Sequence, residues 1–250
     1  MVRFFYIRLR YKPKKFPMKK FRIESVIISL GLFLLGLCIY WGMQSMAQRG
    51  RVVSVRGLAE KEVKADHVIW PIAYRTTSND LGALYDEINQ KNQKIIQFLV
   101  NNGIDKKEIT TTAPDIGDRK SNQYNSDQNG DRYFVKSVLT VSTKQVDKVI
   151  DLIPRMGELL KDGIAIISGE YDTSVEYEFT SLNLIKPEMI EEATQNAREA
   201  AEKFAIDSDS DLGKIQSATQ GLFSIEDRDQ YTPYIKNVRV VTSVNYFLES

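Results

Sequence analysis

The feature that most restricts the fold of this chain is an uncharged, proline-free run of eighteen residues from Val26 to Met43. In a helix such a run spans about 27 Å, which is close to the hydrocarbon thickness of a bilayer. A buried helix of this length in a soluble protein normally carries a polar stripe, and this run carries none. The run therefore predicts one transmembrane helix, with the anchor extending over residues 26–46.

The charges that flank the run predict its orientation. The basic residues before it are Arg3, Arg8, Arg10, Lys12, Lys14, Lys15, Lys19, Lys20 and Arg22, against the single acid Glu24. Cytoplasmic flanks carry an excess of Lys and Arg, so residues 1–25 are predicted to be cytoplasmic and the chain after Gly50 to lie outside. Met18 is an alternative start, and it gives the same orientation.

A cleaved signal peptide is the second interpretation of this segment. Ser45 and Ala47 have the small-residue spacing of a cleavage site, with the cut after Ala47. The apolar run is longer than the usual signal-peptide core of about 7–15 residues, which favours an uncleaved anchor. Cys38 lies inside the apolar run, so we interpret it as a membrane-buried thiol and not as a lipidation site.

The composition of the remaining chain excludes several classes of function. The only cysteine of the whole chain is Cys38 in the anchor, so the exported domain has no disulfide. Its only histidine is His67, which leaves little room for a histidine-based zinc site or a Ser-His nucleophile elsewhere. The basic excess is confined to the N-terminus, so a nucleic-acid surface is not expected. We predict no catalytic, cofactor-binding or metal-binding residues.

Periodicity and turn residues predict the order of elements after the anchor. The predicted strands cover residues 51–58, 66–77, 108–116, 133–141, 167–179, 213–224 and 236–248. A long helix is predicted over residues 81–101, a shorter one after Thr143 that Pro154 kinks or ends, and a third with Pro187 in its first turn. Pro71 predicts an edge position or a bulge within its strand. The first strand is expected to end at Gly57, with residues 59–64 forming either a charged connection or a continuing strand.

These elements fall into two halves of similar order. Each half reads strand, long helix, strand, polar loop, strand, which suggests a weak repeat of a β-α-β-β unit. The exported domain, residues 51–250, is therefore predicted to have lobes of about 51–162 and 163–250. Helices packed on mainly antiparallel sheets define an α+β fold.

Three groups of polar residues are candidate sites, and each also has an ordinary structural explanation. His67 follows Asp66, but neighbours in a strand point to opposite faces, which favours a structural histidine. The acids Asp207, Asp209 and Asp211 have the spacing of a calcium loop, but Leu212 and Ala218 stand where the loop needs Gly and Glu. The acidic row Glu170, Asp172, Glu176 and Glu178 is typical of the wet face of a sheet, and Tyr124, Tyr231 and Tyr234 lie in polar loops.

Several motifs together resemble the SIMPL-domain family of bacterial envelope proteins, which includes periplasmic immunogenic proteins. They are Val53–Gly57 followed by Glu62–Asp66, Lys186–Ile190 with the alanine-rich helix through Phe204, Gln220–Ile225, and Val238–Val244. The resemblance implies an exported α+β domain, often homo-oligomeric and loosely linked to oxidative-stress tolerance. Together with the predicted anchor and its orientation, we expect an inner-membrane protein with a periplasmic domain, and the resemblance transfers no catalytic residue.

Function is expected to be binding or homo-oligomeric assembly. The C-terminal strand 238–248 carries one charge, Arg239, so if it lies at an edge, pairing between subunits would satisfy it. The alternatives are a periplasmic chaperone or transport accessory, which should expose an apolar groove, and a hydrolase that works with carboxylates alone.

Overall fold

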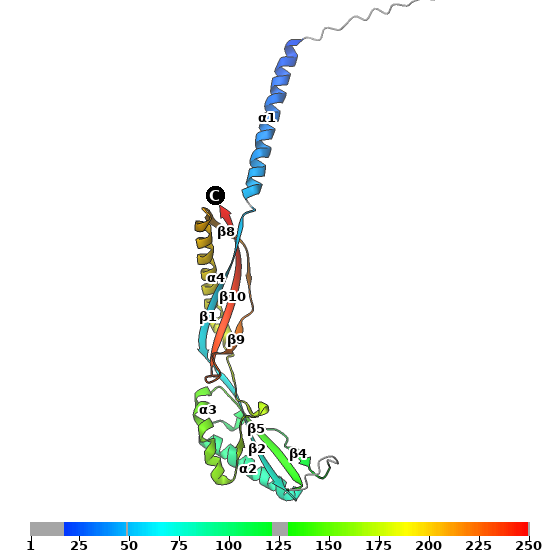
Figure 1. Cartoon of the computed structure of the whole chain (residues 1–250), viewed down its shortest axis with the longest axis vertical. Helices are drawn as coiled ribbons and strands as arrows, with labels where there is room; N and C mark the ends of the chain where they lie inside the picture. The colour runs from blue at the N-terminus through cyan, green and yellow to red at the C-terminus, as the bar shows by residue number, and fades with distance from the viewer. Residues whose placement is uncertain (1–17, 49, 122–129, 250) are drawn as a thin grey trace, which may run out of the picture. The chain divides into compact units, whose positions relative to one another are not determined.

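The computed structural model describes residues 18–48, 50–121 and 130–249 (Figure 1). Its contacts divide the chain into two compact units. One unit comprises the N-terminal residues through Ser54, together with Ala201–Gln216 and Asn245–Ser250; the other comprises Val55–Ala200 and Ser217–Val244.

The described part of the chain contains four α-helices and three short 3-10 helices. The α-helices are α1 (Met18–Gln48), α2 (Leu81–Asn101), α3 (Val146–Leu152) and α4 (Leu182–Asp207). The 3-10 helices are η1 (Lys106–Glu108), η2 (Ile153–Asp162) and η3 (Tyr171–Thr173).

Strands form two separate sheets. The first contains β1 (Val52–Lys64), β8 (Asp211–Gln220), β9 (Ser224–Asp227) and β10 (Ile235–Glu249). The second contains β2 (His67–Ser78), β3 (Ile109–Thr111), β4 (Asp115–Asp118), β5 (Tyr133–Thr143), β6 (Ile166–Ile167) and β7 (Glu176–Glu178). Together with the helices, these sheets confirm the predicted α+β class.

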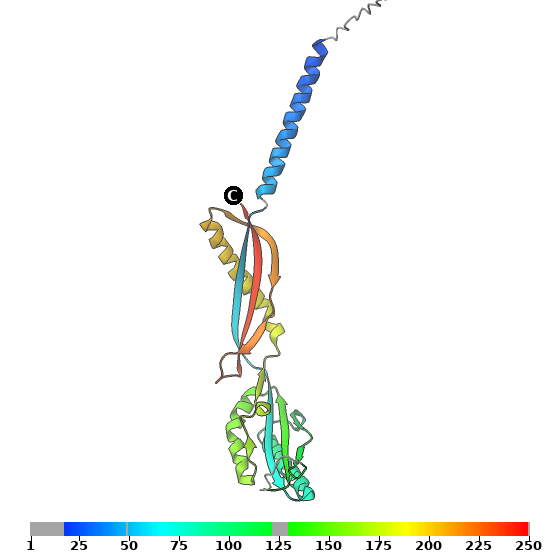
Figure 2. The same cartoon turned by 45° about the vertical axis from the view of Figure 1, so that its right-hand side comes forward.

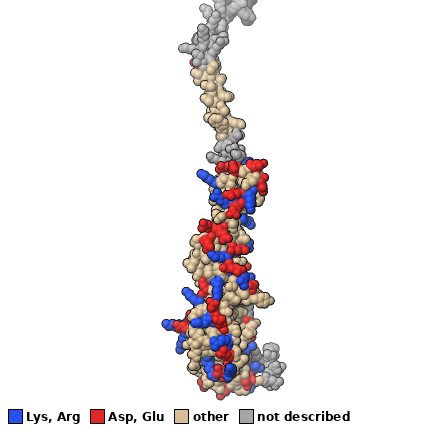
Figure 3. Space-filling view, turned by 90° about the vertical axis from the view of Figure 1, so that its left-hand side faces the viewer, with Lys and Arg blue, Asp and Glu red and all other residues tan. Residues whose placement is uncertain are grey.

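Helix α1 contains the apolar run. Within it, Glu24–Met43 is long and apolar enough to cross a membrane, and none of that stretch is buried in protein. Figure 3 shows mostly uncharged side chains along this segment, while acids and bases are interspersed over the visible face of the other described residues. An exposed helix of this composition is expected to be covered by lipid.

Strand β10 lies in the centre of the first sheet, which has the order β1–β10–β8, with β9 also paired to β10 (Figure 2). Alternate residues of β10 are buried, including Val238, Val240 and Val244. The C-terminal strand is therefore not an edge, and the edge strands are β1 on one side and β8 and β9 on the other, each paired to β10. The low charge of β10 reflects its burial between two neighbours.

Helix α4 packs on this sheet through small side chains. Met189 and Ala193 form a buried cluster with Ala59, Val238 and Val240. A Cβ atom on Gly57 would overlap the carbonyl oxygen of Ala193 and the backbone nitrogen of Ala197. Strand β1 continues past Gly57 to Lys64, so the prediction that it ends there is wrong. Glycine is required at this position because the helix backbone lies against the strand.

The second sheet is built on the long pairing of β2 with β5, which runs from Val68↔Thr143 to Ser78↔Tyr133. Its inner face carries the main core, in which Ile72, Leu139 and Val141 pack against α2, α3 and η2. The predicted helix over residues 81–101 is confirmed as α2. It is capped by Asp80, whose carboxylate accepts hydrogen bonds from the backbone N–H groups of Gly82 and Ala83.

Three other sequence predictions need correction. The strand expected over residues 167–179 consists of two short pieces, β6 and β7, because the chain leaves the sheet between them through η3. The strand expected over 108–116 is interrupted at residues 112–114 before β4 begins. Helix α4 begins at Leu182, so Pro187 lies inside it and not in its first turn.

Each sheet draws strands from both sides of the predicted lobe boundary at residues 162–163. Strand β1 joins β8, β9 and β10 from the end of the chain, and β6 and β7 join β2 and β5. Pro71 lies in the gap along β2 between the residues paired with β7 and those paired with β6. This position agrees with the expectation of an edge or a bulge.

Candidate functional site

The solvent-facing side of the second sheet brings His67 together with two residues distant in the sequence. The Nδ1 atom of His67 lies 3.0 Å from a carboxylate oxygen of Glu178, which is directly opposite it across the β2–β7 pair. Its Nε2 atom lies 3.0 Å from the hydroxyl of Ser142 on β5. The three side chains therefore form a serine–histidine–carboxylate chain of hydrogen bonds.

The order of these groups matches a nucleophile, a general base and an orienting acid. Acyl transfer also needs N–H donors aimed at an oxyanion beside the nucleophile. In the described structure Ser142 lies within strand β5, which pairs with β2. Backbone N–H groups in such a pair donate hydrogen bonds between the strands and are not aimed at an oxyanion. We therefore interpret these hydrogen bonds as a structural link between strands β2, β5 and β7. Ser142 and Glu178 are 75 and 111 residues from His67, so no local sequence pattern links either residue to the histidine.

Replacing His67 by alanine is expected to lower the free energy of unfolding by no more than about 1 kcal/mol. The loss is small because Glu178 and Ser142 are exposed and water can replace the imidazole. Thermal unfolding of His67→Ala beside the wild type measures this. A serine-reactive fluorophosphonate should label neither protein, and labelling of the wild type alone would show that Ser142 is an activated nucleophile.

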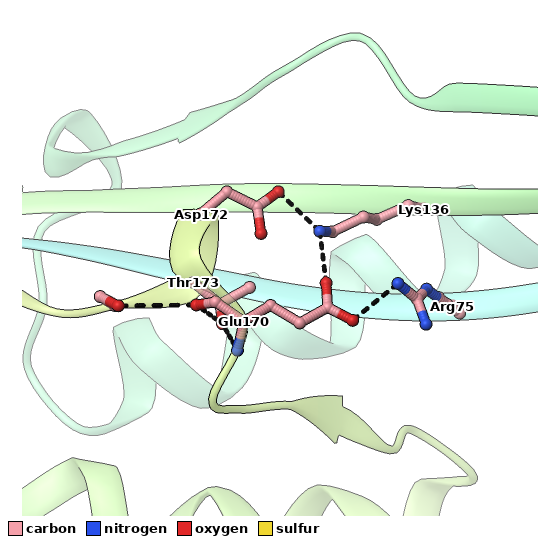
Figure 4. A network of polar contacts seen from close by, with 6 residues as sticks. Arg75, Lys136, Glu170, Asp172 and Thr173 are labelled. Carbon is pink, nitrogen blue, oxygen red and sulfur yellow. Dashed lines mark hydrogen bonds and ion pairs between the residues drawn. The ribbon is translucent and has the colours of Figure 1, made fainter.

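A network of ion pairs lies further along the same face (Figure 4). Arg75 and Lys136 are directly opposite each other across β2 and β5, an arrangement that is unfavourable for two like charges. Glu170 lies between them and contacts both cations at 2.7 Å, and Asp172 contacts Lys136 at 2.6 Å. The hydrogen bond from Lys136 is the main cause that holds the pKa values of Glu170 and Asp172 below their usual range. The network thereby fixes the segment that leaves the sheet between β6 and β7.

The predicted acidic row is thus divided between two structures. Glu176 and Glu178 lie in β7, whereas Glu170 and Asp172 lie in the segment around η3. Three of the four acids have a basic partner, since Glu178 contacts His67 and the other two contact Lys136. The alternation in the sequence indicated one solvent-exposed face of a strand. Alternation alone does not show that Arg75 and Lys136, from other strands, pair with acids that lie outside the sheet.

Asp66 and His67 have separate partners. The carboxylate of Asp66 accepts hydrogen bonds from the backbone N–H groups of Thr180 and Ser181, just before α4, and from the Thr180 hydroxyl. Burial acts to raise the pKa of Asp66, but the hydrogen bonds from Ser181 and Thr180 outweigh it and lower the pKa. Asp66 therefore holds the chain that leads into α4.

The remaining candidates do not converge on one site. Asp207 ends α4, Asp209 has a left-handed φ of 49° in the following turn, and Asp211 begins β8. Among the described residues, no three His, Cys, Asp or Glu side chains are grouped so that they could hold a metal ion. Tyr231 is exposed, while Tyr234 packs edge-on against Tyr177 with ring centroids 6.1 Å apart. Tyr124 lies outside the described residues.

Strand β8 is the least protected element of the first sheet. It is an edge strand, and all of its residues except Leu212 and Gly213 are exposed. From Ile215 to Gln220 it carries no charge, whereas the other edge strand, β1, has charged residues along its length. Ile215 is 50% exposed, and Leu222 just beyond the strand is 96% exposed. Long uncharged edges of this kind are templates for pairing with another chain.

The fold therefore defines an α+β protein in which one apolar N-terminal helix precedes two antiparallel sheets in the sequence. A family model covers residues 53–242 of the chain, that of SIMPL, described as a protein of unknown function (DUF541). Because the match spans more than half of the chain, the protein belongs to the SIMPL family, which confirms the resemblance found in the sequence motifs. No curated protein matches the chain.

Proposed function

We propose that this protein is a single-pass inner-membrane protein whose α+β domain faces the periplasm and acts by homo-oligomeric assembly. The observation that supports assembly best is strand β8, an exposed edge strand whose stretch from Ile215 to Gln220 carries no charge. Antiparallel pairing of β8 with β8 of a second copy would continue the sheet across the interface and join the two sheets. Such a contact is self-complementary, as in most two-fold dimers.

The anchor strengthens this proposal. Each chain carries one apolar helix, so every copy is confined to the membrane plane, where the effective concentration of neighbouring domains is high. Tight affinity between isolated domains is therefore not required. The stress-related role that the family resemblance implies stays a prediction.

We expect the full-length chain, solubilised in a mild detergent, to sediment as a dimer or larger at micromolar concentration. Ile215→Lys should shift it towards the monomer, because the new charge would lie on the paired edge. Leu184→Lys is the matched control, since Leu184 is 81% exposed outside β8 and should not affect assembly. A wild type that remains monomeric at high concentration would contradict assembly and favour a chaperone or transport-accessory role.

The orientation has its own test. The basic residues before α1 predict that protease added to intact spheroplasts digests the domain after Gly50. A tag at the N-terminus should survive in the same experiment because it lies in the cytoplasm. Protection of the domain until the cells are lysed would contradict the orientation, whether or not the protein assembles.

A further inference from the structure

The second sheet has a break beside β2. Residues Ala73 and Tyr74 of β2 pair with β6, and residues 67–69 pair with β7. Between these pairings, the segment that joins β6 to β7 leaves the sheet from Ser168 to Val175. Glu170 and Asp172 of this segment form ion pairs with Lys136 (Figure 4). Pro71 of β2 lies in the break.

A cavity of about 320 Å³ opens at this break. Its walls come from β2, from η2 and from the segment that leaves the sheet, and they include Trp70, Pro71, Met156, Leu160, Ile166 and Val175. None of the lining residues is charged. The hydroxyl of Thr173, one of two hydroxyls in the lining, already donates to the carbonyl oxygen of Glu170 at 3.0 Å. Leu160 is 62% exposed and marks the mouth.

We propose that this cavity is a binding site for the aliphatic chain of a small uncharged molecule. Its volume is within the range of small-molecule sites, which is about 300–1,000 Å³. Most of its lining is aliphatic or aromatic, so an apolar guest would gain contacts there that water cannot make. A charged ligand would lose its hydration here without gaining a counter-charge. This site is separate from the proposed assembly edge, so either proposal can fail alone.

Tryptophan fluorescence provides a direct test, because the chain has only two tryptophans, Trp41 in α1 and Trp70 in the cavity wall. In the full-length Trp41→Phe protein in lipid nanodiscs, emission reports Trp70 alone. The probe is 8-bromo-1-octanol, whose bromine quenches a tryptophan that it touches. We expect saturable quenching by this probe and only weak, linear quenching by 2-bromoethanol. Linear quenching by both would overturn the proposal.

Variants locate the probe. Gly157 lines the cavity, and a Cβ atom added there meets nothing within 4 Å, so Gly157→Leu should fold while it adds bulk at the edge of the site. The concentration for half-maximal quenching should rise at least about tenfold. Leu160→Glu, at the exposed mouth, should weaken binding similarly without disturbing the core, and it decides the test if Gly157→Leu unfolds. Leu184→Ser, at an exposed position outside the cavity, should bind as the parent does; unchanged quenching in both cavity variants would overturn the proposal.

Discussion

Replacing Gly57 by alanine is expected to destabilise the domain by about 3 kcal/mol. The added methyl group would overlap the backbone of α4 at Ala193 and Ala197 and would come within 2.9 Å of the Ala197 Cβ atom. Backbone atoms cannot rotate aside as a long side chain can, so the helix would have to move off the sheet. Thermal or denaturant-induced unfolding, followed by circular dichroism, measures the loss.

Gly157→Ala is the matched control for this substitution. The same methyl group at Gly157 meets no atom within 4 Å, so the free energy of unfolding should change by no more than about 0.5 kcal/mol. Equal melting temperatures for Gly57→Ala and the wild type would show that α4 does not approach β1 as closely as the structure places it. The position of Gly57 within a family motif would then need another explanation.

Val244→Lys is expected to cost on the order of 5 kcal/mol and to unfold the domain in a large share of molecules. Val244 is 0% exposed in the central strand β10, where an ammonium group would lose its water without gaining an acid. A charge at this position therefore tests folding and not assembly. Loss of protease resistance and of the cooperative melt would measure the effect.

Ser243→Lys is the matched control, since Ser243 is the adjacent residue and is exposed on the opposite face of β10. Its melting temperature should stay near that of the wild type. If Val244→Lys remained folded and merely dissociated an oligomer, β10 would have to be an edge strand. That result would contradict the sheet order β1–β10–β8.

Strong local signals made some elements predictable. The apolar run predicts helix α1, and the Asp80 cap with its apolar periodicity gives α2 with the observed ends. Such signals depend on neighbours within one or two helical turns. The alternation at residues 167–179 failed as a strand signal because Lys136 and Arg75, which come from other strands, hold Glu170 outside the sheet.

The candidate sites show the same division. The sequence singled out His67 as the only histidine and Glu178 as part of an acidic row, but it did not join either of them to Ser142, because only strand pairing brings the three within hydrogen-bond distance. The cavity beside Trp70 gave no sequence signal, because its walls come from β2, η2 and the segment around η3.

The sequence by itself determined the apolar N-terminal helix, the α+β class and the family, because hydropathy, periodicity and short motifs are properties of neighbouring residues. Only the tertiary structure decided which strands are edges. The C-terminal strand has the composition of an unprotected edge, yet it is central because β1 and β8 pair on either side of it. Strand order depends on contacts between residues far apart in the chain, and a weakly charged strand has the same pattern whether a neighbouring strand or another subunit covers it.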